Sequence, residues 1–207
     1  MIDAQALPTI AILALPEAGA SVVFGMYDMF KSAGRDWGMI ESGEPGASLL
    51  NAIIVSRNGG TVVGVNGVRI DSHYSLTECT RPDIVCVPEI NVPPDAFDGQ
   101  EFVAEVAWLK QCYATGAVIA TACSGAMLLA EAGLLDGHEA TTHWAYCDVL
   151  TRRYKSVKVC AQRALVVSGD AQRLIMAGGG TSWLDLALYL IARTTSVEAA
   201  CRLHVST

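Results

Sequence analysis

Basic residues are scarce in this sequence of 207 residues, which contains 14 Lys and Arg against 21 Asp and Glu. The formal net charge is −7, and the longest basic cluster is the pair Arg152-Arg153. A protein that grips a phosphate backbone needs a positive surface. We therefore expect no DNA binding by these residues themselves.

The cysteines lack the spacing of a metal site or of a disulfide framework. There are seven, with no CxxC pair, at positions 79, 86, 112, 123, 147, 160 and 201. Scattered, odd-numbered cysteines are typical of proteins in a reducing cytosol. His143 and Cys147 lie four residues apart, but two ligands do not make a metal site. We expect no metal and no other cofactor.

Signals for export and for membrane insertion are missing as well. Asp3 and the absence of an early Lys or Arg do not fit a signal peptide. Polar residues interrupt the longest apolar region, Val118 to Leu135, so a membrane span is not expected. The predicted location is the cytoplasm.

What the sequence has is an alternation of apolar runs with helical patterns. With 52% hydrophobic and 17% charged residues, it suits one α/β domain spanning residues 1–207. Strands are predicted at residues 9–14, 37–40, 52–56, 84–87, 118–122, 140–142, 157–159, 164–168 and 174–177. Helices are predicted at residues 21–33, 98–113, 124–132, 144–154, 182–193 and 196–205. This order favours a mostly parallel sheet with helices on both faces.

Several turns and caps can also be read from the sequence. Asn66-Gly67 lies between two β-rich runs and predicts a small antiparallel hairpin beside the sheet. Ser21 is the expected N-cap of the first helix, and Ser182 and Asp185 are expected to form a capping box. The last helical pattern reaches the end of the sequence without a C-cap, so we expect the polypeptide to continue.

Cys123 is the central candidate for chemistry. An apolar strand pattern ends at Ala122, and a helical pattern begins at Ser124. Such a corner exposes its residue and directs the helix N-terminus at it, which favours a thiolate. A buried cysteine of the hydrophobic core remains the alternative.

Four loops should meet near this corner, at the carboxyl ends of parallel strands. They contain Glu17, the pair Glu89-Ile90, the pair Cys123-Ser124, and the turn with Gly179 and Thr181. His143 precedes a helix and can be either a proton carrier or a helix-start residue that hydrogen-bonds to the backbone. Trp144 is expected in the pocket wall or the core.

The sequence resembles the ThiJ/PfpI superfamily, which has the class I glutamine amidotransferase fold. The motifs that carry the resemblance are Ala122-Cys-Ser-Gly-Ala126, Gly133-Leu-Leu-Asp-Gly137 and Thr141-Thr-His-Trp144. Within the superfamily, it is most similar to the N-terminal domains of AraC-type (GlxA-like) transcriptional regulators. The resemblance implies a flavodoxin-like three-layer sandwich and association as a homodimer.

The resemblance also implies roles for individual residues. It makes Cys123 the nucleophile of the enzymatic members and His143 its candidate partner. The enzymes commonly place an acid near the start of the first helix, where this sequence has Ser21-Val22-Val23, and Glu17 comes too early. Where they tend to have Pro-Gly-Gly, this sequence has Pro88-Glu89-Ile90, and a carboxylate there would oppose an oxyanion. Both departures point to binding rather than turnover.

Three hypotheses follow. The first is a ligand-sensing domain of an AraC-type regulator, which binds a small polar or amine-containing metabolite near Cys123. DNA binding would then belong to a helix-turn-helix domain beyond Thr207. The second is a cysteine-dependent hydrolase, hydratase or glyoxalase-like enzyme that uses Cys123 and His143. The third is an oxidation sensor based on an exposed thiol of low pKa.

Overall fold

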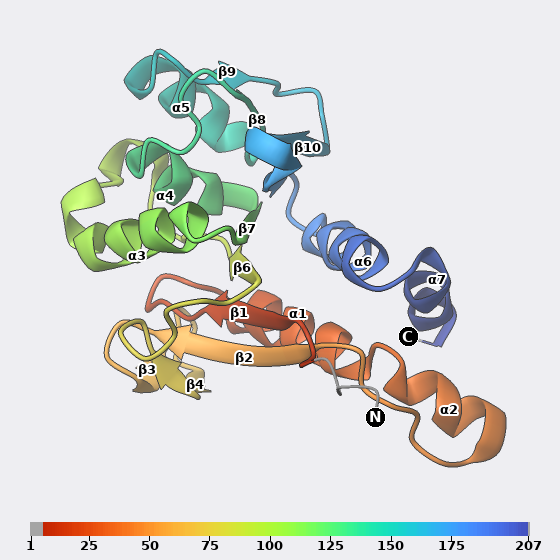
Figure 1. Ribbon diagram of the computed structural model, residues 1–207. Coiled ribbons are helices and arrows are strands. Elements are labelled where there is room, and N and C mark those ends of the chain that lie inside the picture. The colour runs from red at the N-terminus through yellow and green to blue at the C-terminus, as the bar shows by residue number, and fades with distance from the viewer. Residues whose placement is uncertain (1–5, 207) are drawn as a thin grey trace.

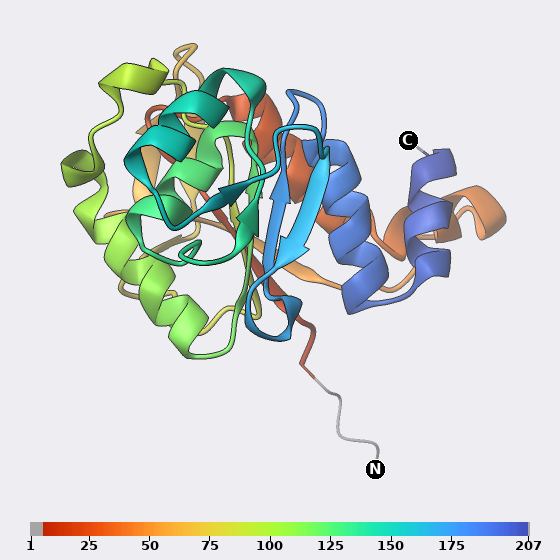
Figure 2. The same cartoon turned by 90° about the horizontal axis from the view of Figure 1, so that it is seen from above.

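The computed structural model describes residues 6–206, and the expected three-layer α/β sandwich is confirmed. Figures 1 and 2 show a central sheet between two groups of helices. The helices α1 (Ala20–Ser32) and α6 (Trp183–Thr194) cover one face. The other face is covered by α3 (Val103–Ala114) and α4 (Ala126–Glu131). Burying both faces explains why the central strands are apolar runs rather than alternating patterns.

Within the described residues, the central sheet has seven strands in the order β10-β11-β7-β6-β1-β2-β5. Their bounds are β1 (Thr9–Leu13), β2 (Asn51–Ser56), β5 (Tyr74–Ser75), β6 (Ile84–Val87), β7 (Val118–Ala122), β10 (Leu165–Ser168) and β11 (Leu174–Ala177). All neighbours pair in parallel except β10 and β11, which are antiparallel. The strands therefore direct most of their carboxyl ends to one edge, where a ligand site is expected.

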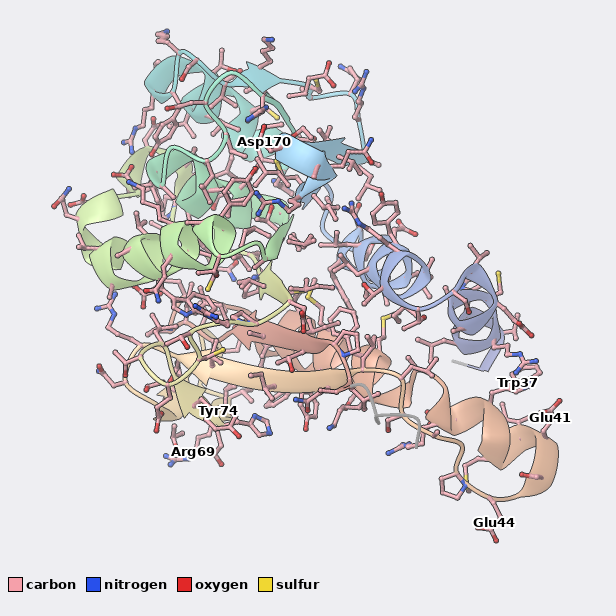
Figure 3. All side chains as sticks on the ribbon, viewed as in Figure 1. Trp37, Glu41, Glu44, Arg69, Tyr74 and Asp170 are labelled. Atoms are coloured by element: carbon pink, nitrogen blue, oxygen red, sulfur yellow. The ribbon has the colours of Figure 1, made fainter. Side chains whose placement is uncertain are left out.

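The predicted hairpin is also confirmed. Strands β3 (Gly60–Val63) and β4 (Arg69–Ser72) pair in antiparallel fashion outside the central sheet. Gly67 has a φ of 76°, a conformation that glycine adopts without strain, and it lies in the connecting turn. Figure 3 shows Arg69 on this hairpin and Tyr74 close to it.

The segment 37–40 was wrongly predicted as a strand. It lies inside the helix α2 (Arg35–Ser42), which is flanked by Gly34 and Gly43 with φ values of 81° and 76°. Four residues are too few to distinguish helical from strand periodicity. The helix packs against α7 (Val197–Ser206), and Figure 3 shows Glu41 and Glu44 at its outer end, away from the sheet.

The two predicted helix caps are wrong as well. The first helix begins at Ala20 with Gly19 as its N-cap, so Ser21 lies inside it. Ser182 precedes α6 but makes no side-chain cap bond, because its backbone is already helical, with φ −66° and ψ −7°. A capping serine normally has an extended backbone. The turn after β11 thus winds directly into α6.

The segment 157–159 does not join the central sheet as predicted. Strand β9 (Lys158–Val159) instead pairs with β8 (Glu139–Ala140) in a separate two-stranded parallel sheet. The helix α5 (Cys147–Arg153) lies between these two strands in the chain and begins after a 3-10 turn at Trp144–Tyr146. No helix within residues 6–206 has both the length and the hydropathy needed to cross a bilayer.

Candidate functional site

The order of the strands reverses between β1 and β6. The chain places β2 on one side of β1 and then crosses to place β6 on the other. Open α/β sheets bind ligands in the crevice beyond the carboxyl ends of strands at such a switch point. The loops that leave these two strands carry Glu17 and Glu89, and the N–H of Asn91 donates to the Glu17 carbonyl at 2.8 Å. The two loops therefore form one joined structure.

Cys123 occupies the sharp corner that the sequence predicts. Strand β7 ends at Ala122, and a 3-10 turn from Cys123 to Gly125 leads into α4. Cys123 has a φ of 56°, in the left-handed region, where a residue with a Cβ is strained by about 1–2 kcal/mol. The residue as a whole is partly buried.

Gly125 explains how the corner fits beneath the neighbouring strand. A Cβ at this position would lie 2.4 Å from the carbonyl oxygen of Pro88 and 2.8 Å from that of Val87. Any side chain would therefore push the corner away from the end of β6. Glycine lets the two backbones pack directly against each other.

Ser124 fixes the corner to the loop after β6. Its hydroxyl accepts from the N–H of Ile90 at 2.8 Å and donates to the Ile90 carbonyl at 2.9 Å. Both residues are buried. On the other side, the Thr142 hydroxyl donates to the Cys123 carbonyl at 2.9 Å. Two neighbouring segments thus hold the corner in place.

Glu89 places its carboxyl group at the amino end of α1. A Cβ on Gly19 would lie 2.2 Å from its Oε1 atom, so the carboxyl group can lie there only because residue 19 is glycine. Burial raises the pKa of Glu89, and backbone N–H groups of Glu89 and Gly19 partly offset this. Its Oε2 atom is buried and has no hydrogen-bond partner among the described residues.

The thiol of Cys123 is not favoured as a thiolate. Burial raises its pKa, and the negative charge of Glu89 raises it further, whereas hydrogen bonds from Ser124 lower it. Desolvation is the largest of these effects. The expectation drawn from the helix start alone is therefore wrong for this site.

His143 is connected to the corner at Cys123 by the contacts of its neighbours Thr142 and Tyr146. It is the N-cap of the turn before α5, and its Nδ1 accepts from the N–H of Ala145 at 3.3 Å. Its ring is 6.2 Å from that of Tyr146, whose hydroxyl donates to the carbonyls of Ile90 and Val92 at 3.2 and 2.5 Å. Any proton transfer by His143 would have to use Nε2.

The remaining predicted site residues lie further out. The ring of Trp144 lies 5.3 Å from that of His143 and is tilted against it by 37°, yet Trp144 is 78% exposed, so it is not part of the core. The carbonyls of Gly179 and Thr181 accept from backbone N–H groups at the start of α6. Gly19, which makes room for the Glu89 carboxyl group, and Tyr146, which bonds to the loop after β6, were not predicted from the sequence. Both roles depend on contacts with segments distant in the chain.

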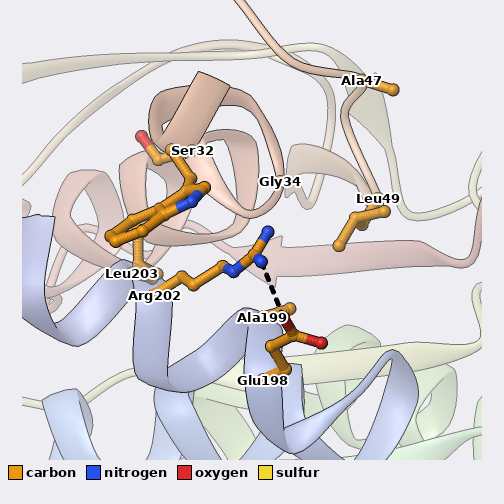
Figure 4. Close-up of a pocket in the computed structure, with 9 residues that line it drawn as sticks. Ser32, Gly34, Ala47, Leu49, Glu198, Ala199, Arg202 and Leu203 are labelled. Atoms are coloured by element: carbon orange, nitrogen blue, oxygen red, sulfur yellow. Dashed lines mark ion pairs between the residues drawn. The ribbon is translucent and has the colours of Figure 1, made fainter. Parts of the chain in front are cut away.

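A separate cavity of about 220 Å³ lies where α2 and the loop after it face α7 (Figure 4). Arg202 lies 5.3 Å from the ring of Trp37 and 2.7 Å from the carboxylate of Glu198. The Nε1 atom of Trp37 is buried without a hydrogen-bond partner among the described residues. None of the residues that line this cavity belongs to the corner around Cys123.

Comparison with known proteins gives one family. The model of the DJ-1/PfpI family matches residues 10–193. The HTH-type transcriptional regulator CdhR of Pseudomonas aeruginosa is 32% identical over 154 residues, which are 74% of this chain and 44% of CdhR. The isonitrile hydratase of Pseudomonas putida is 29% identical over 140 residues, 67% of this chain and 57% of the hydratase. The chain therefore spans about half the length of these relatives.

Solved structures agree on the fold. A crystal structure of an AraC family transcriptional regulator from Pseudomonas putida superposes with a TM-score of 0.75 at 16% identity. The match covers 96% of this chain and 98% of that one. At this identity the likeness supports the fold alone.

Proposed function

The chain belongs to the DJ-1/PfpI family, and from this we propose that it is the ligand-sensing domain of an AraC-type transcriptional regulator. A small metabolite binds where the loops after β1, β6 and β7 meet, beside Cys123. Residues 1–207 form one domain, and a helix-turn-helix domain beyond Thr207 binds DNA. The protein works as a homodimer in the cytoplasm.

The observation that carries this proposal is the position of Glu89 next to Cys123. Burial is the largest cause of the raised pKa of the thiol, and the negative charge of Glu89 raises this pKa further. A nucleophilic cysteine needs the opposite environment, one that stabilises the thiolate. The corner is thus built to hold a neutral thiol in a fixed position. The similarity to CdhR supports the regulatory role.

In this proposal, the predicted site residues occupy different parts of the binding site. Glu17 and Glu89 supply carboxyl groups, while Cys123, Ser124 and Ile90 form the floor of the site. His143, Trp144, Gly179 and Thr181 form its rim. A ligand that contacts both joined loops can change the position of the elements that follow them, which is what a sensing domain requires.

The gene itself provides the first test. We expect the reading frame to continue beyond the codon for Thr207 and to encode a basic helix-turn-helix segment. The full-length product should retard DNA from the neighbouring promoter region in a gel, and a metabolite extract should change this retardation. A stop codon directly after Thr207 would contradict the proposal.

A second candidate function is a cysteine-dependent enzyme. It is favoured by the strained φ of 56° at Cys123 and by the similarity to an isonitrile hydratase. In this case the thiol of Cys123 would add to the carbon of an isonitrile while His143 transfers the thiol proton through Nε2. Water would then hydrolyse this adduct, release an N-substituted formamide and restore the thiol. The test is turnover of alkyl isonitriles by the purified chain. Activity that disappears in Cys123→Ser would favour the enzyme over the sensor.

A further inference from the structure

A cleft of about 720 Å³ lies beside Glu17, away from the thiol. It is lined by residues 14–17, 56–59 and 61–63 and by Glu101, Phe102 and Glu105. These segments are the loop after β1, the end of β2 with the turn that follows it, the hairpin strand β3, and the 3-10 turn Gly99–Phe102 with the start of α3. Cys123 is not among the residues that line it. The volume lies in the range of small-molecule sites, about 300–1,000 Å³.

Arg57 is the one cation among the described residues that line the cleft, and it is already paired. Arg57 donates to both carboxylate oxygens of Glu105, at 2.9 Å from Nε and 2.7 Å from Nη2. The Glu105 side chain is 1% exposed, whereas that of Arg57 is 47% exposed. Nη2 of Arg57 also donates to the carbonyl of Glu101 at 2.6 Å. The buried carboxylate thus neutralises the guanidinium group.

The remaining charges in the cleft are negative. Glu17, Glu101 and Glu105 carry three carboxylates against the one guanidinium of Arg57, which leaves two negative charges. The Oε2 atom of Glu17 is buried and has no hydrogen-bond partner among the described residues. A buried carboxylate oxygen without a hydrogen-bond donor is costly. Like Glu105, Glu17 attracts Arg57 and helps to raise the pKa of that guanidinium group, but no described group donates a hydrogen bond to Oε2 of Glu17. A positively charged group would satisfy it.

Glu17 also connects the cleft to the corner at Cys123. The Glu17 carbonyl accepts from the backbone N–H of Asn91 at 2.8 Å and from its side chain at 3.1 Å. Two residues after Glu17, Gly19 makes room for the carboxyl group of Glu89, which lies close enough to Cys123 to raise its pKa. A ligand that moves the loop at Glu17 would therefore change the surroundings of the thiol.

We propose that this cleft is a second ligand site of the sensing domain, in addition to the one beside Cys123, and that it binds a small organic cation whose positive group pairs with the carboxylate of Glu17. This inference goes beyond the proposed function, which places a metabolite beside Cys123. Glu101 adds negative charge at the mouth of the cleft. The Arg57–Glu105 pair forms its floor.

The test uses three probes of equal chain length: butylammonium, butyramide and butyrate. Each is titrated into the isotope-labelled chain at constant ionic strength, and amide shifts are followed by NMR. We expect butylammonium to shift signals of residues 14–17 and 56–59, and the neutral and anionic probes to leave them in place. The thiol reactivity of Cys123 should change with butylammonium alone.

Variants then locate the charge. Glu17→Gln should weaken the binding of butylammonium about tenfold to a hundredfold, the range for a hydrogen bond between charged groups. Glu101→Gln should weaken it less and provides a second measurement if Glu17→Gln does not fold. Glu44→Gln is the matched control, because Glu44 lies at the outer end of α2 (Figure 3) and should have no effect.

Several results would overturn the inference. Equal shifts with all three probes would mean that charge is not recognised. If butyrate bound more tightly than butylammonium, the ligand would be an anion that pairs with Arg57. If Glu17→Gln bound butylammonium as tightly as the wild type, the cation would not pair with Glu17. Failure of the proposed function can be distinguished from failure of this inference. If the gene encodes no DNA-binding segment but the chain binds butylammonium in the cleft, the regulatory role is refuted and the cation site stands.

Discussion

Ser124 and Ile90 exchange two hydrogen bonds, one in each direction, between the corner at Cys123 and the loop after β6. A single hydroxyl therefore satisfies both backbone groups of a buried residue. The same loop carries Glu89, so the bond pair fixes the distance between the carboxyl group and the thiol. The chemistry of the site depends on this link.

Removing the link should destabilise the protein. Ser124→Ala leaves the buried N–H of Ile90 without a partner, and we expect a loss of about 1–3 kcal/mol in the free energy of unfolding. Urea denaturation measures it. Ser182→Ala is the matched control, since the Ser182 hydroxyl caps nothing and its loss should cost less than about 0.5 kcal/mol. Equal losses in the two variants would contradict this account.

The alkylation of Cys123 should follow its raised pKa. We expect the iodoacetamide rate to rise with a midpoint above the ordinary thiol value of about 8.5, measured by mass spectrometry of the Cys123 peptide. Glu89→Gln should lower this midpoint because it removes a neighbouring negative charge. A midpoint below the ordinary value would restore the enzymatic hypothesis.

Stability should respond to pH through Glu89. The folded protein binds the proton of this carboxyl group more tightly than the unfolded chain, since burial raises the pKa. The stabilisation is full below the ordinary carboxyl pKa of about 4.3 and is lost as pH rises through the raised value. Glu89→Gln should therefore gain stability relative to the wild type as pH rises through this window. Parallel pH curves for the two proteins would refute the assignment.

The strained backbone at Cys123 predicts an unusual preference for glycine. At φ 56° a side chain costs about 1–2 kcal/mol, which exceeds the entropy cost of glycine, about 0.5–1 kcal/mol. Cys123→Gly should thus be about 0.5 kcal/mol more stable than Cys123→Ala in thermal unfolding. At the exposed helical position Ala107, replacement by Gly should instead cost about 1 kcal/mol. The same sign at both positions would rule out strain at the corner.

Much of the fold could be predicted from the sequence, because it is encoded locally. The apolar runs at β1, β2, β6, β7 and β11, the glycine of the hairpin turn and the corner at Cys123 all depend on neighbours in the chain. Residues 37–40 show the limit of this approach. Their pattern is too short to distinguish a strand from a helix, and the helix is stabilised by packing against α7, more than 150 residues away.

The sequence by itself determined that a cysteine stands at a strand–helix corner and that acidic residues follow two of the strands. Only the tertiary structure decided what these residues do. It placed the Glu89 carboxyl group on Gly19, joined Ser124 to Ile90, and formed the cleft in which Glu105 neutralises Arg57. The reason is that burial and charge at a point are sums over every segment that packs there, and no single stretch of sequence contains those neighbours.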